Sequence, residues 1–97
     1  MGPGRVELLE LIGETGNLRA AALKMGVSYM RAWNLVKYTN RCFSQPLVEA
    51  IRGGRTGGGA KLTEVGQEVV SEYREMEKES QKAILRTGAA IRRHLKK

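Results

Sequence analysis

Residues 18–41, LRAAALKMGVSYMRAWNLVKYTNR, restrict the fold of this chain more than any other stretch. They predict two short helices joined by a tight turn at Gly26, because glycine accepts the positive φ that such a turn requires. Small Ala22 lets the two helices approach each other, and Ser28 is placed to cap the second helix. A helix pair with this turn is typical of a helix-turn-helix, whose second helix enters the major groove of DNA.

The second of these helices, expected over residues 28–41, has an inner and an outer face. Positions i, i+3 and i+4 of a helix lie on one side, and the residues expected to pack inward are Ala32, Trp33, Leu35 and Val36. The outer residues are candidates for DNA contact: Ser28, Tyr29, Met30, Arg31, Asn34 and Lys37. Arg31 can donate two hydrogen bonds to guanine, Asn34 can pair with adenine, and Lys37 can neutralise a phosphate. The alternative for each is an ordinary solvated side chain.

A β-hairpin is expected after Pro46, because proline ends helical order at or before the preceding residue. Residues 47–52 predict one strand and residues 60–62 a second. The seven residues 53–59 between them include five glycines, which favour a loop. A strand, a loop and a strand after a helix-turn-helix make a winged-helix domain, in which the loop is the wing.

The wing and the neighbouring cations are further candidates for DNA contact. Arg55, which has glycines close by on both sides, is expected to enter the minor groove or to pair with a phosphate. Phosphate contacts are also expected from Thr56, Lys61, Arg19, Lys24 and Arg41. The alternative for the wing is a hairpin tip without a partner.

Apolar residues at helical spacing in residues 4–14 predict a first helix. We expect it to pack across the helix-turn-helix pair and to complete a core of three helices. Gly16 is placed to end this helix and Asn17 to cap the next one.

A last helix is expected to begin after Thr63, which is placed as its N-cap, and to run to about Arg86. Thr87 and Gly88 are expected to break it, which leaves residues 88–97 as a basic tail. A core of three helices cannot cover so long a helix, so its distal half is expected to pack on a second copy of the chain. The residues expected at that dimer interface are Val69, Tyr73, Met76 and Ala83.

The net charge of +7 is unevenly distributed along the chain. Residues 15–62 carry +7 and residues 82–97 carry +6, whereas residues 64–79 carry −4. This asymmetry indicates a polyanionic partner for one surface of the protein. No apolar run approaches the ~20 residues that span a bilayer, so we expect no membrane association.

Catalytic and metal-binding motifs find little support in the sequence. The glycine run is not a phosphate-binding loop, because Ala60 stands where that motif requires lysine. Cys42 is the single cysteine, which excludes an internal disulfide and a zinc site made of cysteines. It is expected to be a small buried hydrophobe in a cytoplasmic protein, and His94 lies in a different element. We therefore expect neither an enzyme nor a cofactor.

Several short motifs in order resemble one regulator family over roughly residues 5–80. They are Gly16-Asn17-Leu18 through Ala22, Met25-Gly26-Val27-Ser28-Tyr29, Arg31-Ala32-Trp33, Leu35-Val36, Asn40, Pro46-Leu47-Val48, the glycine-rich run 53–60, and Lys61-Leu62-Thr63 followed by Gly66. The chain resembles the N-terminal domain of ModE-type molybdate-responsive transcriptional regulators and, more loosely, the DNA-binding half of LysR-type regulators. The resemblance implies a winged-helix domain, dimerisation through the first and last helices, and DNA binding by the third helix and the wing. ModE-type regulators carry molybdate-binding modules after the last helix, and this sequence stops there, so the resemblance implies no molybdate sensing.

The sequence therefore predicts a mainly α-helical domain with a small β-hairpin. Residues 1–62 are expected to form the winged helix-turn-helix, and residues 63–87 the dimerisation helix of the same domain. The favoured function is a dimeric transcriptional regulator that binds double-stranded DNA. The alternatives are a non-specific DNA-binding module and a protein-interaction module that uses the acidic last helix. A separate effector-sensing subunit, and a free-standing chain as opposed to one domain of a longer regulator, both stay open.

Overall fold

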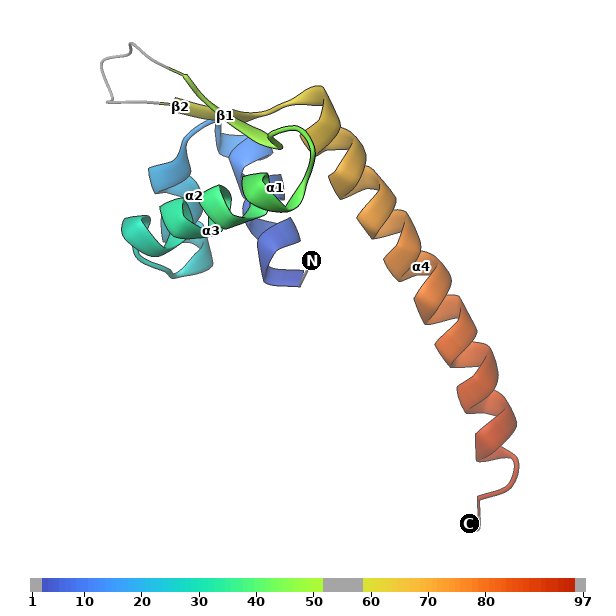
Figure 1. The fold of residues 1–97 in the computed structure, drawn as a ribbon. Coiled ribbons are helices and arrows are strands. Elements are labelled where there is room, and N and C mark those ends of the chain that lie inside the picture. Colours follow the sequence, from blue (N-terminus) through green and yellow to red (C-terminus); the bar gives the residue numbers. More distant parts are fainter. Residues whose placement is uncertain (1–2, 52–58, 96–97) are drawn as a thin grey trace.

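The computed structural model describes residues 3–51 and 59–95, and it has the predicted winged-helix architecture. Three helices form a small bundle, a two-stranded antiparallel hairpin lies at one end of it, and a long helix leads away (Figure 1). The elements in chain order are α1 (Pro3–Thr15), α2 (Leu18–Met25), α3 (Tyr29–Cys42), β1 (Val48–Ile51), β2 (Gly59–Leu62) and α4 (Glu64–Arg92). Within these described residues, no helix combines the length and the apolar character that a membrane span needs.

The core lies where α1, α2 and α3 meet, as expected for a bundle of three helices. Leu9 and Ile12 of α1 are buried against Ala21 of α2 and Ala32 of α3, and both alanines are fully inaccessible to solvent. Small side chains at these two positions let the helix backbones approach closely while the larger α1 side chains fill the space. Val36 completes the inner face of α3, and Trp33 and Leu35 are half-buried beside it.

The predicted helix caps are confirmed. The Asn17 side chain accepts a hydrogen bond from the Ala20 N–H at 3.0 Å, and the Ser28 hydroxyl accepts one from the Arg31 N–H at 3.1 Å. Gly26 has a φ of +76°, which ends α2 in the left-handed conformation expected for the turn. These caps fix the short connections that orient α3 relative to α2.

The hairpin is anchored to the helix bundle at its base. Val48 and Ala60 are buried, and the Ala60 N–H donates to the Gly16 carbonyl at 3.1 Å, which ties β2 to the turn between α1 and α2. The strands differ from the predicted ranges only at their ends. Leu47 precedes β1 and is fully buried, β2 begins one residue earlier than expected, and residue 52 lies outside the described residues.

The start of α4 is held against Leu47. Thr63 caps α4 as predicted, since its hydroxyl accepts from the Gly66 N–H at 2.9 Å, and the same hydroxyl donates to the Pro46 carbonyl at 2.8 Å. The Thr63 N–H also donates to the Leu47 carbonyl at 3.0 Å. Gly66 lies so close to this carbonyl that a Cβ at position 66 would sit 2.2 Å from the oxygen. Glycine is therefore required here for close packing.

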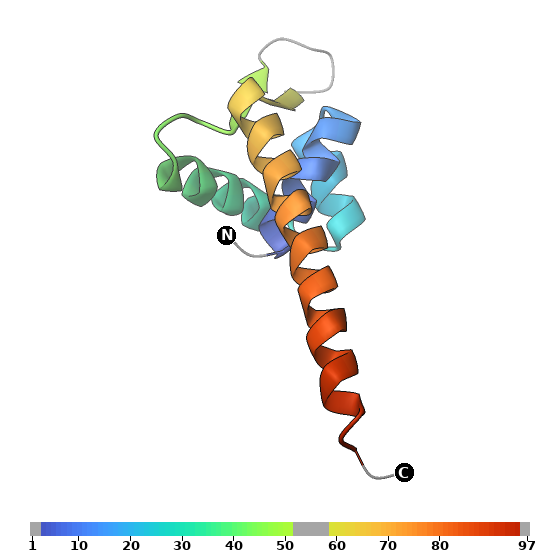
Figure 2. The ribbon, with the colours of Figure 1, turned by 90° about the vertical axis from the view of Figure 1, so that its right-hand side faces the viewer.

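α4 is longer than predicted. The expected break at Thr87 and Gly88 is wrong, because the helix continues through both residues to Arg92. A single glycine costs a helix only about 1 kcal/mol, and the Ala89 and Ala90 that follow are the strongest helix formers. Figure 1 and Figure 2 show the second half of α4 extending beyond the bundle in both views.

Substitution of two glycines in the same helix tests the packing at the start of α4. In Gly66→Ala the new methyl group meets the Leu47 carbonyl, and overpacking of this kind costs about 1–3 kcal/mol, more than the gain in helix propensity of about 1 kcal/mol. We expect a lower free energy of unfolding in urea. Gly88→Ala is the control, because nothing lies within 4 Å of its Cβ position, and it should leave stability unchanged or slightly higher. Equal stabilities for the two variants would contradict the close contact.

Candidate nucleic-acid interface

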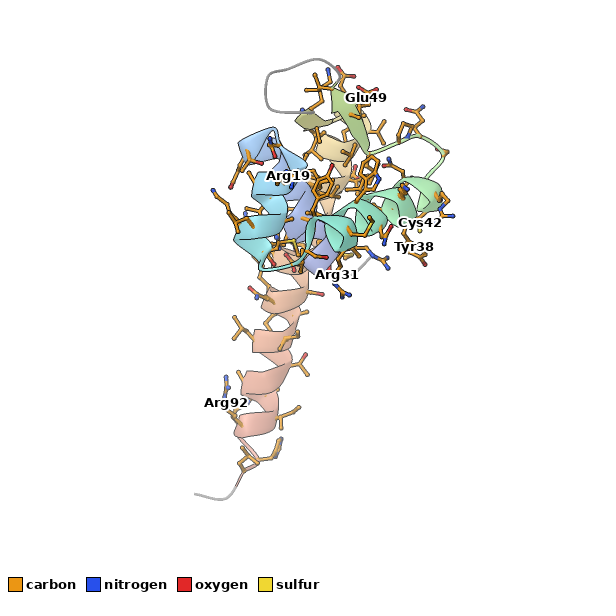
Figure 3. The ribbon with its side chains drawn as sticks, turned by 90° about the vertical axis from the view of Figure 1, so that its left-hand side faces the viewer. Arg19, Arg31, Tyr38, Cys42, Glu49 and Arg92 are labelled. Atoms are coloured by element: carbon orange, nitrogen blue, oxygen red, sulfur yellow. The ribbon has the colours of Figure 1, made fainter. Side chains whose placement is uncertain are left out.

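The outer face of α3 is open to solvent along its length. All six residues predicted to contact DNA on this helix and its cap are exposed: Ser28, Tyr29, Met30, Arg31, Asn34 and Lys37. Figure 3, which views the molecule from this side, shows Arg31 near the start of α3 and Tyr38 and Cys42 towards its end. Of the residues predicted to face inward, Ala32 and Val36 are buried on the opposite side, whereas Trp33 and Leu35 are only half-buried and Leu35 also reaches the outer face.

Cys42 is a correction to the sequence analysis, because it is exposed and not buried. The buried residues of α3 are Ala32, Val36 and Thr39, which recur at steps of four and three. Cys42 is the last residue of α3, and Phe43 follows it in an extended conformation and is half-buried against the core. The helix therefore ends at Cys42, before the next buried position of the pattern, which would be residue 43.

Arg55 and Thr56, the predicted wing contacts, lie outside the described residues. Lys61, the third residue predicted to contact DNA from the hairpin, is exposed on β2. It lies in register opposite Glu49 on β1, so a neighbouring carboxylate partly offsets its charge. The open end of the hairpin, at Ile51 and Gly59, points to the side of the molecule where α3 begins, away from α4 (Figure 1). The hairpin and the start of α3 thus share one side of the protein.

Two cation–aromatic pairs connect α3 to the other two helices of the bundle. The Arg19 guanidinium of α2 lies 4.5 Å from the centre of the Tyr29 ring, and the Arg5 guanidinium of α1 lies 4.3 Å from the centre of the Tyr38 ring. Contacts of this kind contribute about 0.5–1 kcal/mol at exposed sites. They hold Tyr29 and Tyr38 in place while the cations stay at the surface.

Tyr38 belongs to the interface, although the sequence analysis did not select it. A shallow hollow follows the outer face of α3, and its lining residues are Ser28, Met30, Arg31, Asn34, Leu35, Lys37, Tyr38 and Arg41. Tyr38 is 48% exposed and stands next to Lys37 in this lining. Its spacing of four residues from Asn34 and seven from Arg31 was the available signal, because such positions share a helix face, whereas the partner that holds it, Arg5, lies in a different helix.

The electrostatic character of this face is positive. Residues 15–48 contain no aspartate or glutamate, and their cations are Arg19, Lys24, Arg31, Lys37 and Arg41, all exposed. Among the described residues, no group of three histidine, cysteine or carboxylate side chains is arranged to hold a metal ion. A surface with cations, hydrogen-bond donors and exposed aromatic rings suits the phosphates and base edges of a nucleic acid.

Asn40 fixes the hairpin relative to α3. Its side-chain oxygen accepts from the Leu47 N–H at 2.9 Å and from the Val48 N–H at 3.2 Å, and its side-chain nitrogen donates to the Val48 carbonyl at 3.1 Å. In the sequence, Asn40 stands out only as part of the family resemblance, without a role. The structure makes it the link that holds the base of the hairpin, at Leu47 and Val48, against α3.

Curated proteins that match this chain carry the names ModE or Mop. The chain is 44% identical over 84 residues to the molybdenum-pterin-binding protein MopA of Rhodobacter capsulatus, a match that covers 87% of this chain and 32% of MopA. It is 37% identical over 82 residues to the DNA-binding transcriptional dual regulator ModE of Escherichia coli K12, which covers 84% of this chain and 31% of ModE. The chain therefore spans about a third of the length of these relatives. No family model matches it.

Solved structures with a similar fold are DNA-binding regulators. The CbnR_DBD–DNA complex superposes with a TM-score of 0.70 at 23% identity, over 94% of this chain and 99% of that chain. A LysR family transcriptional regulator gives a TM-score of 0.64 at 22% identity, over 84% of this chain and 26% of that chain. At these identities the likeness establishes the winged-helix fold alone.

Two asparagines of α3 allow a test of what holds the base of the hairpin. In Asn40→Ala the N–H groups of Leu47 and Val48 lose their acceptor, and partly buried groups left without a partner cost about 1–3 kcal/mol each. We expect a free energy of unfolding lower by about 2 kcal/mol. Asn34→Ala, on the exposed face, should leave stability unchanged. If chemical denaturation gives the two variants the same stability, Asn40 does not have this role.

Proposed function

Since the chain is a ModE-like winged-helix domain, we propose that it binds double-stranded DNA as a dimeric transcriptional regulator. The observation that carries this proposal is the outer face of α3, which is exposed, free of carboxylates and capped at its start by Ser28. The name of the ModE relative, a DNA-binding transcriptional regulator, supports the same function. We propose no enzymatic activity, and the compartment is that of the DNA, the cytoplasm.

In this proposal α3 lies in the major groove, and some of its exposed side chains contact bases while others contact phosphates. Arg31 reads guanine with two hydrogen bonds and Asn34 reads adenine, because these side chains match the donors and acceptors of those bases. Tyr29 and Met30, at the start of the helix, contact base edges. Ser28 and Lys37 contact phosphates, which fix the position of the helix and do not read sequence.

The wing completes the contact with the adjacent backbone or minor groove. Arg55 and Thr56 are proposed to reach the DNA from the loop 53–59, with glycines that let the backbone come close. Lys61 on β2 adds a phosphate contact, weakened by Glu49 opposite it. The support for this part is the direction of the hairpin, whose open end lies on the side where α3 begins (Figure 1).

Dimerisation is proposed through the second half of α4. In the first half, Val69 packs against the core of its own chain and Tyr73 is half-buried. The same helix face continues beyond the bundle, where Met76 and Ile84 are 56% and 67% exposed and Ala83 is exposed between them. An apolar face that extends beyond the core of its own chain is typical of a helix that pairs with another helix.

The charge along α4 supports a second copy as the partner. Residues 64–79 carry −4 and residues 82–97 carry +6, so two copies of α4 in opposite directions would bring acidic and basic halves together. The two recognition helices of such a dimer would lie about 34 Å apart, one turn of DNA. A regulator of this kind prefers a site with two related halves.

Replacement of Arg31 by alanine tests the reading face of α3. We expect Arg31→Ala to lose about 1–3 kcal/mol of discrimination at one base position, roughly 10- to 100-fold in affinity for a site selected from random DNA. Lys37→Ala should lower the affinity for all DNA sequences alike. It should also reduce the slope of log affinity against log salt concentration by about one, the contribution of one phosphate contact. Lys78→Ala, an exposed cation on α4, is the control and should bind normally. Fluorescence anisotropy gives all three affinities. Unchanged binding by Arg31→Ala would favour a protein-interaction module.

Two aspartates introduced on opposite sides of α4 test the dimer. Ile84→Asp places a charge in the exposed apolar face and should convert the dimer to a monomer, because a buried unpaired carboxylate is strongly unfavourable. Ala89→Asp makes a similar change on the other side of the helix and should leave the dimer intact. Sedimentation equilibrium measures the mass, and circular dichroism checks that both variants keep their helices. A monomeric wild-type protein at micromolar concentration would contradict this part of the proposal.

A further inference from the structure

α4 is attached to the rest of the molecule along its first part, where Val65, Val69 and Val70 pack against the core, and polar contacts lie at both ends of this stretch. The first is its start, where Thr63 and Gly66 contact Leu47. The second is Arg74, whose side chain forms an ion pair with Glu10 of α1. The two attachments lie eight residues apart, which corresponds to about 12 Å along a helix. Of these contacts, the ion pair lies furthest along α4.

The second attachment has a defined geometry. The Arg74 Nε donates to Glu10 Oε2 at 2.9 Å, and a second guanidinium nitrogen donates to the other Glu10 oxygen, so the carboxylate is held by both prongs of the planar fork. The remaining guanidinium nitrogen donates to Glu77, one turn further along α4, at 2.5 Å. Glu77 therefore orients Arg74 towards Glu10. The Arg74 guanidinium also holds the pKa of Glu10 below its ordinary value of 4.5, so this carboxyl is ionised at neutral pH.

Beyond this ion pair α4 has no further support from its own chain within the described residues. Every residue from 78 to 87 is exposed. From Arg74 to Arg92 the helix extends for about 27 Å. A displacement of 1 Å at Arg74, about 12 Å from the first attachment, therefore moves the far end by about 3 Å, close to the rise of one base pair.

We infer that Glu10 and Arg74 are positioning residues that set the separation of the two DNA half-sites accepted by the dimer. The inference rests on the proposed function, because it needs two copies joined through the distal part of α4. If that part is shared by two chains, the angle between α4 and the bundle determines how far apart the two α3 helices stand. The Glu10–Arg74 ion pair, the contact furthest along α4, sets this angle together with the apolar packing that precedes it, without any contact with DNA.

The test measures binding to a series of DNA duplexes in which two copies of a selected half-site are separated by different numbers of base pairs. The wild-type dimer should prefer one spacing over its neighbours by on the order of tenfold. Glu10→Gln, which keeps the shape and removes the charge, should flatten this preference to within about threefold, with unchanged affinity for a single half-site. The exchange of all three charges, Glu10→Arg and Arg74→Glu with Glu77→Arg, should restore the preference.

A distance measurement gives an independent readout that does not depend on DNA. Cys42 is the single cysteine, it is exposed, and it is the last residue of α3, so one spin label per chain reports the separation of the two recognition helices. Double electron–electron resonance should give a narrow distance distribution for the wild-type dimer and a broad one for Glu10→Gln.

Glu79→Gln is the matched control. Glu79 pairs with Lys82 at 3.6 Å on the exposed half of α4 and has no contact with the bundle, so this variant should keep the wild-type spacing preference and the narrow distribution. The inference is wrong if Glu10→Gln keeps the spacing preference and the narrow distance distribution, or if Glu79→Gln loses these two properties to the same extent as Glu10→Gln. A wild-type protein that fails to bind even a single half-site would overturn the proposed function itself, and the inference with it.

Discussion

The packing around Leu47 is the contact on which the arrangement of this protein depends. Its side chain is fully buried, its N–H donates to Asn40 of α3, and its carbonyl accepts from Thr63 while Gly66 lies against it. One residue between α3 and the first strand thus joins α3, the hairpin and α4. Displacement of this segment would change the position of the hairpin and the direction of α4 together. The geometry of the proposed DNA-binding surface is therefore set by backbone contacts away from that surface.

α4 shows how one sequence pattern can serve two kinds of packing. Near its start the apolar face covers the bundle, with Val65 and Val69 against the core. Further along, the same face carries Ile84 and Ile91, both more than half exposed. Nothing in the local sequence marks the change, because the helix and its pattern are continuous and only the bundle ends. The ion pair between Arg74 and Glu10 lies near this transition, and it separates the part of α4 that belongs to the domain from the part available to a partner.

The features that could be predicted from sequence are those whose physical cause is local. Asn17, Ser28 and Thr63 cap helices because their side chains accept a hydrogen bond from the backbone N–H three residues later. Gly26 has a positive φ because of the turn it forms. The contacts of Asn40 and of Arg74 could not be found in this way, since Arg74 meets Glu10 across 64 positions in sequence. The prediction that Cys42 is buried was wrong because its burial depends on where the bundle stops, which no local pattern records. The predicted end of α4 was wrong because a single glycine costs too little to break a helix in which two alanines follow. The order of the motifs was sufficient to predict the fold class. The DNA contacts of Arg55 and Thr56 stay predictions.

The outer face of α3 combines fixed and free side chains, and this division has a consequence for recognition. Tyr29 and Tyr38 are held under arginines from α2 and α1, and Lys37 lies 5.4 Å from the centre of the Trp33 ring. Side chains that are already ordered lose little conformational entropy when they meet DNA, so these groups favour affinity at small cost. Arg31 and Asn34 have no side-chain hydrogen bond or ring contact of this kind in the described part of the chain, and both are exposed. They are free to adapt to base edges. In the proposed complex with DNA, affinity comes mainly from a preorganised, positively charged frame, and Arg31 and Asn34, which this frame leaves unconstrained, contribute most to discrimination between sequences.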